Sequence, residues 1–134
     1  MNDSGGTGVV SVQVPIGDRS YPVLVGHGAV SGLPALLPAA ARQVVVITQP
    51  GIPFSIDAHL DLPVTTVHVG HGEQHKTLAT VEMLCNHFAE IGLSRNDVVI
   101  GVGGGMVTDI AGFAAATWHR GVPVVHVATS LLAM

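Results

Sequence analysis

Three consecutive glycines, Gly103 to Gly105, are the residues of this sequence with the clearest potential for chemistry. They follow a β-branched run and precede a helix-like segment, and glycine lets a backbone approach a ligand closely. The first turn of a helix offers unpaired N–H groups and the positive end of the helix dipole to an anion. This arrangement predicts a phosphate cradle, although a tight strand-to-helix turn without a ligand would use the same residues.

The glycine pattern departs from two familiar nucleotide-binding motifs. Gly101 and Gly103 supply the first two glycines of G-x-G-x-x-G, but Met106 stands at the third position. No acidic residue is evident at the downstream position that contacts a ribose, and no Gly-Lys-Ser/Thr of a P-loop follows. The spacing alone therefore leaves the ligand open.

Asp109 lies four residues after Gly105, in what we expect to be the first turn of a helix over residues 108–118. A carboxylate in a first turn is stabilised by the helix dipole, so helix capping is one interpretation. The other is a polar anchor beside a bound cofactor or substrate. Arg120 has two interpretations as well, because a cation just after a helix is favourable without any ligand.

Histidines and the single cysteine offer weaker candidates. His71 and His75 flank Glu73, but the order differs from His-Glu-x-x-His, and Gly72 makes the segment a loop; we expect residues near a ligand and not a metal site. His68 and His126 fall in strand runs, as interior or edge residues. Cys85 falls in a helical apolar pattern and is expected in the core.

Strands and helices that alternate along the chain would position these residues. Residues 44–47 and 98–102 are continuous β-branched runs, typical of strands buried on both faces. We expect two further strands at 64–69 and 122–127, and helices at 78–91 and 108–118. The order predicts a Rossmann-like, doubly wound, mainly parallel sheet in the α/β class.

The first third of the chain has a different pattern. Two weakly alternating runs at 9–14 and 21–25, joined by a turn at 16–20, predict an N-terminal β-hairpin, with a short helix following at 29–37. With 134 residues, we expect a disordered leader at 1–8 and one α/β domain at 9–134.

Composition excludes several classes of function. Charged residues make up 10% of the chain, far below the roughly 25% usual for soluble proteins, so we expect another domain or subunit to cover part of the surface. No apolar run reaches the roughly 20 residues of a membrane span. A net charge of −4 argues against a nucleic-acid partner. No secretory signal begins the chain, which favours the cytoplasm.

Three segments, in order and spacing, resemble the 3-dehydroquinate synthases: residues 72–76, 103–121 and 129–132. The resemblance covers most of the chain, and the long second segment is its most specific part. It implies a phosphorus–oxygen lyase of the shikimate pathway, which leads to chorismate and the aromatic amino acids. Such an enzyme converts 3-deoxy-D-arabino-heptulosonate 7-phosphate to 3-dehydroquinate and phosphate, with NAD and a divalent metal, zinc or cobalt. The cofactor carries the hydride chemistry.

The resemblance also implies roles for individual residues. It implies that the adenosine side of NAD is held by Gly72, Glu73, Gln74, His75 and Lys76. The diphosphate would be held by Gly104, Gly105, Met106, Val107 and Thr108. Asp109 would hold the nicotinamide side, and Thr129 and Ser130 would also contact the cofactor. Arg120 matches an arginine that, in dimers of this family, reaches a substrate phosphate in the neighbouring subunit, where a guanidinium can donate two parallel hydrogen bonds.

Four positions depart from the family pattern. Ser130 replaces a threonine but keeps the hydroxyl, and Ala128 stands where proline is usual. Thr108 replaces a common glycine, which makes the loop less permissive. Gln49 stands where an acidic or Asn-containing segment follows the second strand, so the ribose contact is not fixed by the pattern.

The family's metal ligands, a glutamate and two histidines, come from a helical C-terminal domain that this sequence does not contain. We therefore expect no metal ligand here, assign no catalytic residue, and expect the isolated chain to be inactive. The apolar end at 130–134 suggests a chain cut before such a domain. Other sugar phosphate cyclases, a polyol dehydrogenase, and a non-catalytic NAD-binding or dimerisation module remain as alternatives.

Overall fold

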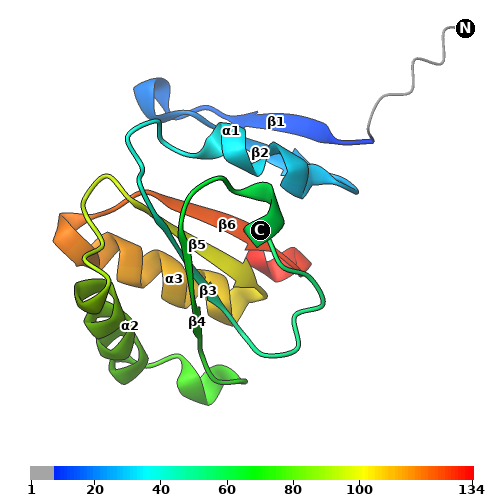
Figure 1. Ribbon diagram of the computed structural model, residues 1–134. Helices are drawn as coiled ribbons and strands as arrows, with labels where there is room; N and C mark the ends of the chain where they lie inside the picture. The colour runs from blue at the N-terminus through cyan, green and yellow to red at the C-terminus, as the bar shows by residue number, and fades with distance from the viewer. Residues whose placement is uncertain (1–7) are drawn as a thin grey trace, which may run out of the picture. The chain divides into compact units, whose positions relative to one another are not determined.

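The structure is a computed structural model that describes residues 8–134 in two compact units, which divide between Leu36 and Leu37 (Figure 1). The leader expected at 1–8 lies outside the described residues except for Gly8. In the part of the chain that is described, no helix is both long and apolar enough to cross a membrane.

The first unit contains the predicted β-hairpin. Strands β1 (Val10–Val14) and β2 (Tyr21–Val25) pair antiparallel, with Val10 opposite Val25, and a 3-10 turn (Gly17–Arg19) connects them. The short helix expected at 29–37 is a 3-10 turn (Ala29–Gly32) followed by a single α-helical turn, α1 (Leu33–Leu36). The hairpin is confirmed, and the helix is shorter than expected.

The second unit is built on a four-stranded parallel sheet, which confirms the predicted fold class. Its strands are β3 (Val44–Thr48), β4 (Val64–His68), β5 (Val98–Gly103) and β6 (Val124–Ala128), in the order β4-β3-β5-β6 (Figure 1). Every residue of β5 is buried, as the unbroken β-branched run predicted for a central strand.

Two long helices cover one face of this sheet. Helix α2 (Leu78–Glu90) buries Val81, Leu84 and Phe88, and helix α3 (Gly105–Thr117) buries a nearly continuous apolar surface. Both pack on a core that includes Val45 and Ile47 of β3. The side-chain hydroxyl of Thr77 accepts a hydrogen bond from the N–H of Thr80 and so caps the start of α2.

Two predicted boundaries were displaced. Strand β6 begins at Val124, two residues late, because Pro123 has no N–H to donate to the sheet. Helix α3 begins at Gly105 and not at 108, because the third glycine already adopts helical geometry behind Gly104 as N-cap. Asp109 therefore lies in the second turn of α3, and the expectation that it lies in the first turn was wrong.

The strand order reverses at one point in the sheet. The chain moves outward from β3 to β4, returns past β3 to β5, and continues to β6. Because parallel crossovers are right-handed, the β3–β4 connection must cover the face opposite to α2 and α3. Ile56, in that connection, is 2% exposed. The reversal between β3 and β5 is where doubly wound sheets bind ligands, at the carboxyl ends of the strands.

Candidate functional site

The glycine loop lies at the carboxyl end of β5, beside the reversal in strand order. Gly104 is extended, and its carbonyl accepts hydrogen bonds from the N–H groups of Val107 and Thr108, both at 3.1 Å. The first N–H groups of α3 have no carbonyl four residues before them within the helix, so they are available to a ligand. The loop therefore offers backbone donors at the positive end of the α3 dipole.

The glycines divide into two kinds according to what a side chain would meet. A Cβ on Gly101 would lie 2.8 Å from Ala111 Cβ, and a Cβ on Gly103 would lie 2.8 Å from Val107 Cγ2, so both let α3 approach β5. A Cβ on Gly105 would make only ordinary van der Waals contact with the Leu132 carbonyl group, 3.7 Å from its oxygen and 3.9 Å from its carbon. Packing does not require glycine at 105, which leaves close approach by a ligand as a reason for it.

Two hydroxyl-bearing residues reach the same loop from the end of β6. The N–H of Thr129 donates to the Gly103 carbonyl at 2.9 Å. Ser130 Oγ lies near Gly104, 3.5 Å from where a Cβ would stand. The structure thus brings both residues to the glycine loop from more than 20 residues away in the sequence.

The side chains of the expected diphosphate segment face inward. Met106, Val107 and Thr108 are buried, and the Thr108 hydroxyl lies 3.3 Å from the Gly105 carbonyl, to which it donates. These three residues can offer a ligand only their backbone. The Thr108 side chain, which stands where the family commonly has glycine, is accommodated within the helix packing.

The expected adenosine loop meets helix α3 through an ion pair. Lys76 Nζ lies 2.7 Å from Asp109 Oδ2 and 3.9 Å from Glu73 Oε2. The hydrogen bond to Asp109, with the charges of Asp109 and Glu73, raises the pKa of Lys76. Both side chains of the closer pair are about half exposed, at 42% and 59%. The pair joins positions 33 residues apart, a contact the sequence did not predict.

The remainder of that loop is fixed by local contacts. Residues Glu73–His75 form a 3-10 turn after Gly72, whose φ of 89° suits glycine. The His75 ring packs against Gly70, where any Cβ would lie 2.5 Å from it. Gln49 Nε2 donates to the Gly70 carbonyl at 3.0 Å. Gln49, which departs from the family pattern after the second strand, is therefore bound to this loop.

A hollow of about 210 Å³ lies at the carboxyl ends of β3, β4 and β5, on the face opposite to α2 and α3. It is lined by Val46, Thr48, Gln49, Pro50, Gly51, Ile52, Phe54, Ser55, Ile56, Asp57, Thr66, His68 and Val102. Sites for drug-sized ligands usually measure roughly 300–1,000 Å³, so this one fits only part of a dinucleotide. In the sequence, only the turn residues after β3, Pro50 and Gly51, pointed to this part of the sheet edge.

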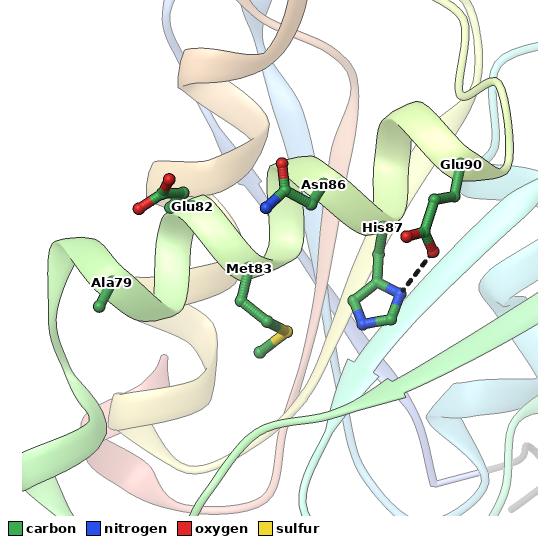
Figure 2. Close-up of a pocket in the computed structure, with 6 residues that line it drawn as sticks. All are labelled: Ala79, Glu82, Met83, Asn86, His87 and Glu90. Carbon is green, nitrogen blue, oxygen red and sulfur yellow. Dashed lines mark ion pairs between the residues drawn. The ribbon is translucent and has the colours of Figure 1, made fainter.

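A wider depression, about 400 Å³, lies along the exposed side of α2 (Figure 2). Ala79, Glu82, Met83, Asn86, His87 and Glu90 line it, all from this one helix. His87 Nδ1 lies 3.5 Å from Glu90 Oε2, with both side chains substantially exposed. No residue expected to bind a ligand lines this depression, so the glycine loop, with its backbone donors at the start of α3, is the better candidate.

Arg120 is not brought to the glycine loop. It lies in a 3-10 turn (Trp118–Arg120) after α3, while the loop lies before α3. A helix of 13 residues separates them by roughly 20 Å at 1.5 Å per residue. Any joint action with this loop would need a second copy of the chain or a large ligand.

The other titratable candidates occupy structural positions. The His126 ring packs against Gly112 of α3, although part of the residue is exposed; burial lowers its pKa, against the opposing charge of Asp109. Cys85 packs against the core as expected, and burial raises the pKa of its thiol. Within residues 8–134, no three His, Cys, Asp or Glu side chains converge as metal ligands.

The reversed strand order, the parallel sheet and the glycine loop before α3 define a Rossmann-like α/β domain. Comparison of this sequence with the profiles of known families identifies the family to which the chain belongs. The chain belongs to the 3-dehydroquinate synthase N-terminal family, whose sequence profile matches residues 66–134, just over half of its length. This match includes the glycine loop, α3 and the Thr129–Ser130 pair.

Individual relatives agree with this family. The chain is 44% identical over 127 residues to a protein of Amycolatopsis mediterranei assigned as an aminodehydroquinate synthase, covering 92% of this chain and 35% of the relative. It is 40% identical over 133 residues to the 3-dehydroquinate synthase of Pelotomaculum thermopropionicum, covering 92% and 36%. The chain therefore spans about a third of the length of the relatives it matches.

A solved structure shares the fold. The crystal structure of a 2-deoxy-scyllo-inosose synthase, complexed with carbaglucose-6-phosphate, NAD⁺ and Co²⁺, superimposes with a TM-score of 0.83 at 28% identity. The match covers 92% of this chain and 36% of that one.

Proposed function

We propose that this chain forms the NAD-binding part of a 3-dehydroquinate synthase, which converts 3-deoxy-D-arabino-heptulosonate 7-phosphate to 3-dehydroquinate and phosphate. The observation that carries the proposal is the cradle formed by Gly104, Gly105, Thr129 and Ser130 at the start of α3. Membership in the family and the NAD⁺ in a solved relative support it.

The residues present fit a dinucleotide. Gly105 leaves the backbone open, the α3 dipole favours the diphosphate, and the hydroxyls of Thr129 and Ser130 are suitable donors. The loop at 72–76, with Gln49 bound beside it at Gly70, would hold the adenosine half. Asp109 holds the nicotinamide side. When bound, NAD supplies a reversible oxidation of a substrate hydroxyl.

Two further requirements of the reaction concern the metal and the phosphate of the substrate. A divalent metal, zinc or cobalt, would be held by side chains outside the described residues; the solved 2-deoxy-scyllo-inosose synthase is complexed with Co²⁺. The full-length protein acts as a cytoplasmic homodimer on a phosphorylated sugar acid, and Arg120 meets the substrate phosphate across the dimer. The isolated chain binds NAD without turnover.

The glycines provide the sharpest test of the cradle. We expect Gly105→Ala to keep or slightly raise stability, since alanine is the better helix former, yet to weaken NAD binding at least tenfold by placing a methyl group in the cradle. Isothermal calorimetry with NAD and urea denaturation of the same samples measure the two effects.

Gly103→Ala is the matched substitution two residues earlier. Its Cβ would meet Val107 at 2.8 Å, so we expect a loss of about 1–3 kcal/mol in the free energy of unfolding. Wild-type material that is folded but binds no NAD would contradict the proposed function. Unchanged affinity in Gly105→Ala would remove this cradle as the diphosphate site.

A second candidate function is another sugar phosphate cyclase. The solved 2-deoxy-scyllo-inosose synthase superimposes on 92% of the chain. This chain is 44% identical to the relative assigned as an aminodehydroquinate synthase and 40% identical to the 3-dehydroquinate synthase of Pelotomaculum thermopropionicum. Turnover of the full-length protein on 3-deoxy-D-arabino-heptulosonate 7-phosphate, its amino analogue and glucose 6-phosphate separates these activities.

A further inference from the structure

The turn that carries Arg120 has an unusual backbone. His119 and Arg120 have φ values of 48° and 64°, in the left-handed region that residues other than glycine, Asn and Asp avoid. The N–H of Gly121 donates to the Trp118 carbonyl at 2.8 Å and closes the turn. Two left-handed residues in succession are typical of a type I′ turn, which selects for glycine and asparagine rather than for histidine and arginine.

Two side chains hold this turn against a single carbonyl. Trp118 Nε1 donates to the Leu93 carbonyl oxygen at 3.0 Å, and His119 Nε2 lies 3.2 Å from the same oxygen. Because a carbonyl only accepts, His119 must carry the proton on Nε2. The two rings also lie against each other, with centroids 4.8 Å apart.

The carbonyl that receives these bonds is itself immobilised. The Leu93 side chain is 1% exposed, and its N–H donates to the Phe88 carbonyl at 2.9 Å, at the end of α2. Phe88 in turn packs edge-on against the Trp118 ring, with centroids 5.8 Å apart. The turn is therefore fastened to the core at two points, while Arg120 is exposed and makes no ion pair with any described residue.

We propose that His119 is a positioning residue for Arg120: with Trp118 it clamps the left-handed turn onto the Leu93 carbonyl, so that the guanidinium is held outward for a phosphate group of the substrate. This inference rests on the proposed function for the identity of the phosphate, but the clamp itself does not. Strained residues persist only where their surroundings hold them, and here the two bonds to Leu93 do so.

Limited digestion with trypsin tests the clamp in this chain, because trypsin cleaves after Arg120. Loss of one hydrogen bond in His119→Ala should open the turn and speed this cleavage roughly 2- to 12-fold. Trp118→Phe keeps the aromatic ring but removes its N–H, and should act in the same direction. Cleavage after Arg19, in the hairpin unit, is the internal control and should not change. Equal rates at Arg120 in both variants and the wild type would overturn the clamp.

Steady-state kinetics of the full-length protein test the role toward phosphate. We expect His119→Ala to raise KM for the sugar phosphate about 2- to 12-fold, with kcat and the Kd for NAD unchanged. His119→Gln, which can return an N–H to the Leu93 carbonyl, should restore KM in part. The same substitution on the exposed side of α2, His87→Ala, is the matched control and should leave all three constants unchanged.

These experiments distinguish the clamp on the turn from the role of Arg120 toward phosphate. If His119→Ala changes KM, kcat and NAD affinity together, or none of them, positioning of Arg120 is wrong. A wild-type protein that binds no NAD and turns over no sugar phosphate would overturn the proposed function and the phosphate role with it. Faster cleavage after Arg120 in His119→Ala would still establish the clamp in that case.

Discussion

At the scale of single residues, the structure changes the interpretation of Asp109. As a first-turn carboxylate it had an explanation in helix capping, but α3 begins at Gly105 and no acidic residue lies in its first turn. Its partner is Lys76, 2.7 Å away on a different element. An ion pair with both side chains this exposed contributes little to stability, because water and salt screen it. A ligand is therefore the better reason for a carboxylate at this position.

Substitution of Asp109 tests that reasoning. We expect Asp109→Asn and Asp109→Ala to weaken NAD binding about tenfold or more, as loss of a hydrogen bond to a charged group does. The midpoint of urea denaturation should hardly move, because the ion pair is exposed. Calorimetric titration with NAD, repeated at low and high salt, makes the measurement.

Lys76→Gln is the companion variant, because it leaves Asp109 without its cation. Because Lys76 is itself expected at the adenosine side of NAD, this variant should also weaken NAD binding, although Asp109 keeps its carboxylate. Folded Asp109→Ala with wild-type affinity would instead leave Asp109 as a partner of Lys76 and nothing more.

At the scale of elements, one buried carboxylate joins the two central strands at the ends remote from the candidate site. Asp97 is 2% exposed. One of its oxygens accepts from the N–H groups of Arg42 at 3.0 Å and Gln43 at 3.3 Å, and the other accepts from Ser94 N–H at 2.8 Å and Gln43 Nε2 at 3.2 Å. The start of β3, the start of β5 and the loop after α2 therefore share one anchor.

These bonds decide the ionisation of Asp97. Burial alone would raise the pKa of this carboxyl, but the hydrogen bonds from Ser94, Arg42 and Gln43 outweigh it and hold the pKa below its usual value. A depressed pKa in the folded state means that the carboxylate stabilises the fold above the unfolded pKa of about 3.9. That contribution is lost as the pH falls through the lower folded pKa.

Asp97→Asn should therefore destabilise the protein by about 2–4 kcal/mol at pH 7. The amide NH₂ group of asparagine is a donor, and it would face N–H groups that are also donors and now bond to the carboxylate. The difference from the wild type should shrink as the pH falls below 4, because the unfolded wild-type chain takes up the proton first and the stabilising contribution of the folded carboxylate declines. Urea denaturation at pH 7 and pH 3 measures both. A difference that is the same at both values would mean that the charge of Asp97 is not what stabilises the fold.

At the scale of the whole molecule, the sequence predicted the elements better than the contacts between them. Periodicity and β-branched runs gave the hairpin, the parallel sheet and α2, because each pattern depends on neighbours along the chain. The start of α3 was missed, since three consecutive glycines indicate a loop, whereas Gly103 ends β5, Gly104 is an extended N-cap and Gly105 is already helical. The Lys76–Asp109 pair and the contact of Thr129 with Gly103 join distant segments, which local patterns do not encode.

The role of Arg120 shows a different limit. Its type and place in a family segment suggested a phosphate ligand, but nothing in the order of residues indicates that His119 and Arg120 adopt left-handed conformations. Only the bonds from Trp118 and His119 to the Leu93 carbonyl account for that geometry. Composition predicted a surface that another domain or subunit covers; Leu131 and Leu132 are exposed in the structure, and their covering stays a prediction.

The two compact units lead to a prediction about unfolding of the whole chain, because each contains one natural fluorophore. Trp118 is the only tryptophan and packs against Phe88 in the sheet unit, while Tyr21 is the only tyrosine and lies in the hairpin unit. A ligand present at about 100 times its Kd stabilises the state that binds it by about 2.7 kcal/mol. For a unit of this size that corresponds to roughly 10–20 °C in melting temperature.

We therefore expect NAD to raise the thermal transition seen by Trp118 fluorescence by about 10–20 °C and to leave the transition seen by Tyr21 unchanged. The cradle belongs wholly to the sheet unit, so binding energy acts there directly. Gly105→Ala, which keeps the fold but fills the cradle, should lose the shift. A shift of both transitions together would show that the two units unfold as one, and a shift of neither would show that NAD does not bind the folded chain.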